Sequence, residues 1–159
     1  MSYLGYNYRI TDIQAAIGIE QLKKLESFVN KRRRIAEIYN NEFKNNPYIQ
    51  IYKNKKYTFN VFHLYTILID FKKIKKTRNK VMSELLDKGV GSQVLYIPVH
   101  KQPFYKNKIK NNLVLNNAEN YYAKCLSIPI YPSLKINEVK KISKIINNVV
   151  SPLKWLIPI

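Results

Sequence analysis

One short segment of the sequence carries four side chains that suit a ligand with phosphate groups and a flat ring. They are Tyr96, His100, Lys101 and Tyr105. A cation pairs with a diphosphate, whereas Tyr and His stack on a ring or form hydrogen bonds. Two prolines, Pro98 and Pro103, restrict the backbone of the same segment. The pattern favours a ligand-binding loop, and an ordinary surface loop with aromatic residues is the alternative.

A second group, formed by Tyr6, Asn7 and Arg9, directly precedes a predicted helix. The amide of Asn7 donates hydrogen bonds of the kind that phosphate oxygens accept. The planar guanidinium of Arg9 pairs with phosphate or with a carboxylate. The alternative is that these residues only shape the turn that leads into the helix.

The other chemically active residues favour structural roles. Two His and one Cys lie far apart in the sequence, so no spacing predicts a metal site. Cys125 is expected to be a buried thiol on the apolar side of a helix, and His63, beside an apolar strand, a buried core histidine. The basic runs at 31–34 and 72–76 are expected to be solvated, since consecutive cations point around most of a helix.

Composition describes an ordinary globular chain with an unusual charge. The 159 residues are 46% apolar and 24% charged, and the formal net charge is +18. This balance excludes global disorder, and the residues contain no apolar run of the length that crosses a membrane. Lys outnumbers Arg 23 to 5, together with many Ile, Asn and Tyr. The basicity therefore indicates codon bias first, and a preference for anionic ligands second.

The longest predicted element is a helix that begins after Thr11. Thr11 and Gln14 fit a capping box, and apolar residues then recur at spacings of three and four to about Lys44, with a break expected near Ser27. Gly89 is placed to end a later helix in the left-handed conformation. The remaining elements are strands over 63–71 and 92–97, helices over 77–88, 117–126 and 136–150, and a loop over 98–112.

This element order predicts an α+β fold, with a long N-terminal helix and a small antiparallel or mixed sheet that packs against helices. We expect an interface segment and long helix over 1–46, a small α+β domain over 47–150, and a tail over 151–159. No repeat interrupts the order.

Three segments, in register, resemble motifs of the DegT/DnrJ/EryC1/StrS family of pyridoxal-phosphate (PLP) sugar aminotransferases. The Gly-Tyr-Asn motif lies in 4–16, the Pro-braced loop in 94–105, and the Asn-Ala-Glu and Leu-Ser-Ile-Pro motifs in 117–132. The residues of these motifs are most similar to those of the branch that makes 4-amino sugars for pseudaminic acid. Leu95 departs from the family, which has a His there, and Lys135 replaces a Ser or Thr helix cap.

The resemblance covers the C-terminal part of the family, the C-terminal domain of a fold-type-I PLP aminotransferase. Family members carry the Schiff-base lysine in a large α/β domain that precedes the Gly-Tyr-Asn motif. Transamination needs that lysine as aldimine partner and as base. The resemblance therefore implies no catalytic residue in this chain, and we expect the chain alone to be inactive.

The resemblance also implies roles for individual residues. Asn7 and Arg9 are expected to bind the cofactor phosphate of a partner subunit, and PLP is not bound covalently by this chain. The expected substrate residues are Tyr6, Tyr96, His100, Lys101 and Tyr105. The expected substrate is a nucleotide-linked keto sugar, and the expected amino donor is glutamate. The protein is expected to be a cytoplasmic homodimer that binds no metal, nucleic acid or membrane.

Two other functions fit the same sequence. One is a basic, Tyr-rich module that binds nucleic acid through phosphates and base stacking. The other is a non-catalytic partner that completes the dimer of a full-length homologue.

Overall fold

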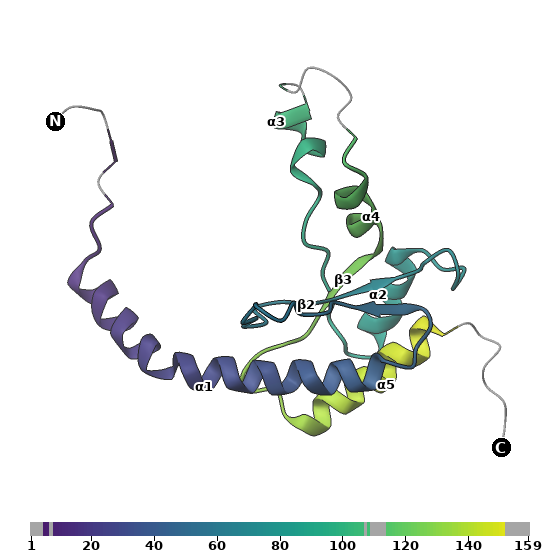
Figure 1. The fold of residues 1–159 in the computed structure, drawn as a ribbon, viewed down its shortest axis with the longest axis horizontal. Coiled ribbons are helices and arrows are strands. Elements are labelled where there is room, and N and C mark those ends of the chain that lie inside the picture. Colours follow the sequence, from purple (N-terminus) through teal and green to yellow (C-terminus); the bar gives the residue numbers. More distant parts are fainter. Residues whose placement is uncertain (1–4, 7, 107, 109–113, 152–159) are drawn as a thin grey trace.

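A three-stranded antiparallel sheet lies at the centre of the molecule (Figure 1). The computed structural model describes residues 5–6, 8–106, 108 and 114–151. The strands are β1 (Ile49–Ile51), β2 (Tyr65–Ile69) and β3 (Cys125–Ile128), and β2 pairs with both of the others. The sheet is thus short, and its middle strand determines which side chains face the core.

Alternation along β2 gives the sheet one apolar face. Tyr65, Ile67 and Ile69 are buried, whereas Thr66 and Leu68 between them are partly exposed. Successive side chains of a strand point to opposite faces, so the buried set faces the helices. The hydroxyl of Thr66 is hydrogen-bonded to that of Ser127 on β3, 2.9 Å away, on the other face.

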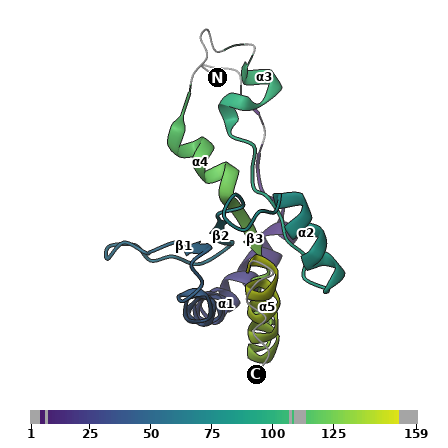
Figure 2. The same cartoon turned by 90° about the vertical axis from the view of Figure 1, so that its right-hand side faces the viewer.

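Three helices pack around the apolar core: α1 (Asp12–Phe43), α2 (Arg78–Asp87) and α5 (Ile136–Val150). Helix α5 contacts both α1 and α2, and Figure 2 shows α1 and α5 side by side below the sheet. Apolar side chains from these helices and the strands form one cluster: Ile35, Tyr39, Phe43, Ile67, Ile69, Val81, Leu85, Leu126, Val139, Ile146 and Val150. The arrangement confirms the predicted α+β class, with an antiparallel sheet.

Helix α1 begins at the predicted capping box. The Thr11 hydroxyl accepts a hydrogen bond from the Gln14 N–H at 3.4 Å, and the Gln14 side chain accepts one from the Thr11 N–H at 3.0 Å. The helix then continues to Phe43 without interruption, so the break expected near Ser27 is wrong. Its second half supplies the core residues of α1, which are Ile35, Ala36, Tyr39 and Phe43.

The end of α2 also confirms its prediction. Gly89 has a φ of +77°, in the left-handed region that side chains disfavour. Its N–H donates to the carbonyl of Leu86, and the N–H of Val90 donates to Leu85. The chain therefore turns back toward the sheet directly after the helix.

One predicted strand is wrong, and one predicted helix ends two residues earlier than expected. The strand expected over 92–97 is absent from the described structure, where only Gln93 forms a bridge with Ser127. The helix expected over 117–126 is α4 (Asn116–Lys124), and β3 follows it directly. Cys125 is therefore buried as predicted, but in a strand, because residues 125–128 pair with β2 and all four are buried. Strand β1 was not predicted.

The predicted loop 98–112 contains two short helical turns within its described residues. These are a 3₁₀ turn, η1 (Val99–Lys101), and α3 (Pro103–Lys106). Figure 1 shows α3 and α4 rising away from the sheet on the opposite side from α1. We refer to residues 94–106 as the substrate-loop segment below. The division of the chain at residues 46 and 150 remains a prediction.

Candidate functional site

Hydrogen bonds within its own backbone stabilise the turns of the substrate-loop segment. The N–H of Lys101 donates to the carbonyl of Pro98 at 2.8 Å, and the N–H of Tyr105 donates to Gln102 at 3.0 Å. The side-chain amide of Gln102 reaches back to the carbonyl of Ile97 at 3.3 Å. These bonds close two tight turns, so the side chains between the prolines are held in fixed directions.

Two predicted substrate residues meet on one carboxylate. The Nε2 atom of His100 lies 3.2 Å from one oxygen of Glu119, and the ammonium of Lys101 donates to the other. Glu119 lies in the first turn of α4. The family-like Asn-Ala-Glu segment and the Pro-braced loop are therefore joined by side chains, a contact that the sequence analysis did not predict.

The electrostatics of this contact favour ionised Glu119. The hydrogen bond from Lys101 is the main cause that lowers the pKa of the Glu119 carboxyl below its usual range, and the bond with His100 adds to it. Both bonds stabilise the charged form of the acid. Because Glu119 offsets the charge of Lys101, the segment is less cationic than its sequence indicates.

The aromatic side chains of the segment point outward. Tyr96 is 75% exposed and Tyr105 is 46% exposed. The ring of Phe104 lies edge-on to that of Tyr105 at 5.2 Å, and the ammonium of Lys108 lies 4.1 Å from its centroid. These rings have the exposure that stacking on a ligand requires, so Tyr96 and Tyr105 remain candidates.

The N-terminal candidates lie on a different part of the molecule, the segment before α1 (residues 5–11), which we call the N-terminal limb. Tyr6 is exposed and its ring lies 5.6 Å from that of Tyr8, and Arg9 is exposed in the extended segment before α1. Asn7 lies outside the described residues. Figure 1 shows this segment well apart from α3 and α4. The fold therefore brings His100 and Lys101 together but leaves Tyr6 and Arg9 on a separate limb.

The N-terminal limb fits a limited contribution to a phosphate site. Arg9 offers a guanidinium, and Tyr6 offers a phenol, both of which donate to phosphate oxygens. Neither residue lines either of the two clefts described below. The limb suits a side chain that reaches toward a cofactor held by another part of the protein.

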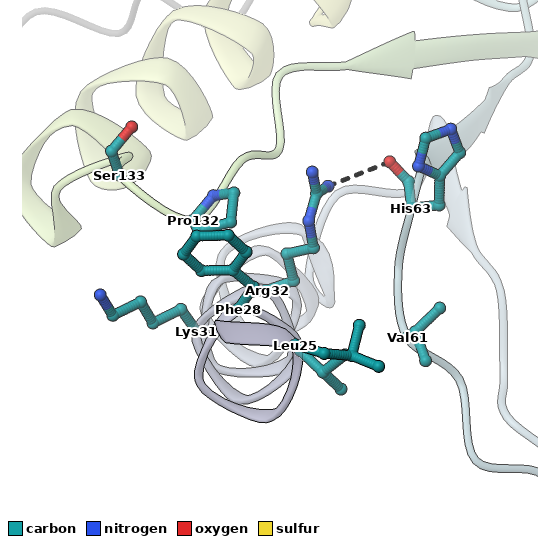
Figure 3. Close-up of a pocket in the computed structure, with 9 residues that line it drawn as sticks. Leu25, Phe28, Lys31, Arg32, Val61, His63, Pro132 and Ser133 are labelled. Carbon is teal, nitrogen blue, oxygen red and sulfur yellow. Dashed lines mark hydrogen bonds between the residues drawn. The ribbon is translucent and has the colours of Figure 1, made fainter. Parts of the chain in front are cut away.

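A cleft of about 490 Å³ lies between α1, the segment before β2 and the segment after β3 (Figure 3). Its walls are mostly apolar, with cationic groups at the rim: Leu25, Phe28, Val29, Lys31, Arg32, Val61, His63, Pro132 and Ser133. His63 is exposed here, so its prediction as a buried core histidine is wrong. It lies at the start of the strand, before the buried alternation begins at Tyr65.

Arg32 organises the walls of this cleft. Its Nη1 atom donates to the carbonyls of Phe62, His63 and Ile130 at 3.2, 3.1 and 2.9 Å. Figure 3 shows the bond to His63. The next residue, Arg33, donates to the carbonyl of Asn60 at 3.4 Å. The run 31–34 was expected to be a solvated face, but these two arginines join α1 to distant loops.

The second basic run holds a comparable exception. Lys76 pairs with Glu84 at 2.6 Å and donates to the carbonyl of Val149 at 3.0 Å, so it ties α2 to the end of α5. A wider cleft of about 660 Å³ opens on the sheet face that carries Thr66 and Leu68, among Tyr52, Phe62 and Tyr121. None of the predicted substrate residues lines either cleft.

In the part of the chain that the structure describes, no group of His, Cys, Asp and Glu side chains could hold a metal ion. The same part contains no helix long and apolar enough to cross a membrane.

Relatives of known name match nearly the whole chain. A Campylobacter jejuni (serotype O:2) protein named UDP-4-amino-4,6-dideoxy-N-acetyl-beta-L-altrosamine transaminase is 38% identical over 154 residues, 97% of this chain and 40% of that protein. The GDP-perosamine synthase of Escherichia coli O157:H7 is 33% identical over 144 residues, 91% of this chain and 37% of that protein. The chain thus spans about 40% of the length of the curated relatives it matches.

Solved structures likewise match most of this chain but only 36–40% of their own length. Helicobacter pylori PseC, described as an aminotransferase in pseudoaminic acid biosynthesis, has a TM-score of 0.81 and 29% identity over 94% of this chain and 40% of its own. The S. venezuelae protein DesV, solved in complex with a ketimine intermediate, has a TM-score of 0.83 and 26% identity over 92% of this chain and 38% of its own. The Streptococcus pneumoniae sugar aminotransferase Spr1654, in its PLP form, has a TM-score of 0.78 and 25% identity over 89% and 36%.

The motif resemblance, the fold and these relatives agree. The sequence pattern of the DegT/DnrJ/EryC1/StrS aminotransferase family matches residues 1–147. This chain therefore belongs to the DegT/DnrJ/EryC1/StrS aminotransferase family.

Proposed function

We propose that this chain forms the C-terminal portion of a PLP-dependent aminotransferase that transfers an amino group from glutamate to a nucleotide-linked keto sugar. The observation that carries the proposal is the family match over 1–147. Relatives named as transaminases of a UDP-linked amino sugar match over 97% of the chain, and a PLP-form neighbour shares its fold. The chain matches only about 40% of those relatives, so the proposal concerns a portion of the enzyme.

The N-terminal limb contributes to the cofactor site across a dimer interface. Bound PLP supplies the electron sink that transamination requires. Asn7 and Arg9 donate hydrogen bonds to its phosphate on the partner subunit. The exposed, extended backbone before α1 supports this role, since such a segment reaches beyond the body of its own chain.

The substrate-loop segment binds the nucleotide sugar. Lys101 is 45% exposed and directs a cation toward a diphosphate, while Tyr96 and Tyr105 stack on or donate to the ligand. Tyr6 contributes a substrate contact from the N-terminal limb. The exposure of the three side chains of the segment supports the proposal.

The chemical step takes place on groups that this chain does not supply. By the family pattern, the Schiff-base lysine lies in the preceding large domain, and that lysine moves the proton between carbon centres. We therefore expect the 159-residue polypeptide alone to bind ligand without converting it.

Complementation tests the proposal. The chain is co-expressed with the N-terminal portion of the Campylobacter jejuni relative that it does not match, and the complex is assayed with PLP, glutamate and the UDP-linked keto sugar. We expect the amino-sugar product from the complex and none from either part alone. A complex that assembles and binds PLP but forms no product contradicts the proposal. The matched control carries Arg34→Ala, a substitution of an exposed cation on α1.

The net charge of +18 supports one other function, binding to nucleic acid. Phosphate contacts of that kind weaken steeply as salt rises. We expect no binding of single-stranded DNA by the chain at physiological salt. Tight, steeply salt-dependent binding would favour the nucleic-acid module instead.

A further inference from the structure

Glu119 uses both oxygens of its carboxylate to hold the substrate-loop segment. One oxygen lies 3.2 Å from Nε2 of His100, and the other accepts a hydrogen bond from the ammonium of Lys101. The acid belongs to α4, whereas both partners belong to η1, 18 and 19 residues earlier. A single side chain thus joins two elements that rise together from the sheet (Figure 1).

The two partners of Glu119 differ in exposure. The side chain of His100 is 7% exposed, that of Glu119 is 28% exposed, and that of Lys101 is 45% exposed. His100 is consequently enclosed between the loop and the carboxylate. Lys101 keeps a large part of its side chain in solvent, where a ligand can reach it.

We propose that Glu119 is a positioning residue, which anchors His100 and directs Lys101 so that the substrate-loop segment presents one oriented cation and two exposed tyrosines to its ligand. The proposal rests on the proposed function for the identity of that ligand, a nucleoside diphosphate. The anchoring itself rests on geometry alone. In this arrangement, His100 fixes the segment in place, and Lys101, Tyr96 and Tyr105 face the ligand.

The effect of Glu119 on anion binding distinguishes a positioning role from simple neutralisation of the Lys101 charge. Removing a carboxylate near a cation normally strengthens anion binding, because the cation is no longer offset. If Glu119 acts by positioning, Glu119→Ala instead weakens anion binding, since His100 loses its partner and Lys101 its direction. The two roles therefore predict opposite signs for one substitution.

The anchoring is tested by NMR on the full 159-residue chain. The Lys101 bond is the largest cause of the lowered pKa of Glu119, so Lys101→Met should raise that pKa toward its usual value. His100→Gln should raise it less. The control is Lys106→Met, which removes a cation of α3 while both oxygens of Glu119 keep their partners. An unchanged Glu119 titration in Lys101→Met would overturn the proposal.

A second signature reads the imidazole directly. In the neutral ring, a hydrogen bond to the carboxylate requires the proton on Nε2. Long-range ¹H–¹⁵N spectra of the wild-type chain should show that tautomer at His100, and Glu119→Ala should give a mixture. A ring that keeps one tautomer in both proteins would contradict the anchoring.

Ligand binding is measured with uridine diphosphate as the probe. Glu119→Ala should weaken binding about tenfold, and Glu119→Gln, which keeps an acceptor oxygen, should recover part of the loss. Stronger binding by Glu119→Ala overturns the positioning role. A wild-type chain that passes both NMR tests but does not bind uridine diphosphate contradicts the substrate assignment under the proposed function, while the anchoring by Glu119 stands.

Discussion

The two halves of α1 have the same secondary structure but opposite environments. From Phe28 to Phe43 the helix packs on α5 and β1, and Tyr39 and Phe43 are fully buried. From Asp12 to Ser27 the apolar side chains are exposed, with Ile13, Ile17 and Leu22 each at least 60% exposed. Apolar spacing predicts a helix in both halves. It does not predict which half finds a partner within the chain.

This difference bears on the proposed function. An apolar face on a helix normally packs against another element, whereas most apolar side chains of the first half of α1 are exposed in the described part of the chain, and Leu25 lines the cleft beside Val61. A helical segment of about 16 residues with few tertiary contacts is also only marginally stable in water. We infer that the first half of α1 is a contact surface for the portion of the relatives that this chain does not match.

The largest expected difference between the halves is in side-chain truncation. Tyr39→Ala removes a fully buried ring that stacks on Phe43 and donates to the carbonyl of Pro129 at 2.8 Å. We expect a loss of about 3–5 kcal/mol in the free energy of unfolding, as for other buried aromatic residues. Ile17→Ala should change it by less than about 0.5 kcal/mol. Urea unfolding monitored by circular dichroism measures both, and equal losses would refute the division of α1.

The cleft wall gives the next largest effect. Arg32→Ala leaves three backbone carbonyls without their donor, and we expect a loss of about 2–3 kcal/mol, because bonds to a charged donor are strong. Arg34→Ala, at an exposed position of the same basic run, should stay within about 0.5 kcal/mol. Thermal unfolding distinguishes them. Similar melting temperatures for the two variants would show that the whole run is a solvated face.

Alkaline pH should destabilise the packed half selectively. Burial raises the pKa of Tyr39 and of Tyr65 well above the usual value for tyrosine. Their neutral forms stabilise the fold fully below the usual tyrosine pKa of 10, and this contribution is lost progressively as the pH rises from 10 toward the raised pKa values. At pH 11 the loss is about 1 kcal/mol for each phenol. Tyr39→Phe should reduce the pH dependence of the unfolding free energy; an unchanged dependence would contradict the burial argument.

The smallest global effect is expected at the start of α1. Thr11→Ala removes a cap that contributes about 1 kcal/mol to a helix. The cap lies in the exposed half of α1, so the loss should appear as faster amide exchange in the first turns. The global free energy of unfolding should hardly change. A large drop in global stability would mean that the first half of α1 folds cooperatively with the core.

Features that depend on neighbouring residues could be predicted from the sequence. The capping box joins Thr11 to Gln14, and the turn at Gly89 joins residues three to five positions apart. The apolar pattern of α5 likewise predicted its bounds of 136–150. In each case the interacting groups lie within one or two helical turns, so spacing alone contains the information.

Features that depend on distant partners could not be predicted. The bond from Arg32 to Ile130 joins residues 98 positions apart, and Glu119 meets Lys101 across 18. Strand β1 has only three residues and becomes a strand by pairing with β2. The misassigned helix end at Cys125 has the same cause, because pairing with β2 determines the conformation of β3. The substrate and cofactor residues themselves remain predictions.

Hydrogen–deuterium exchange along α1 tests the central claim most directly. In the 159-residue chain, we predict fast exchange over 12–27 and strong protection over 28–43, since only the second half is packed. In the complex with the N-terminal portion of the Campylobacter jejuni relative, residues 12–27 should become protected as well. Equal protection of both halves in the chain alone, or continued fast exchange of 12–27 in an assembled complex, would contradict the account.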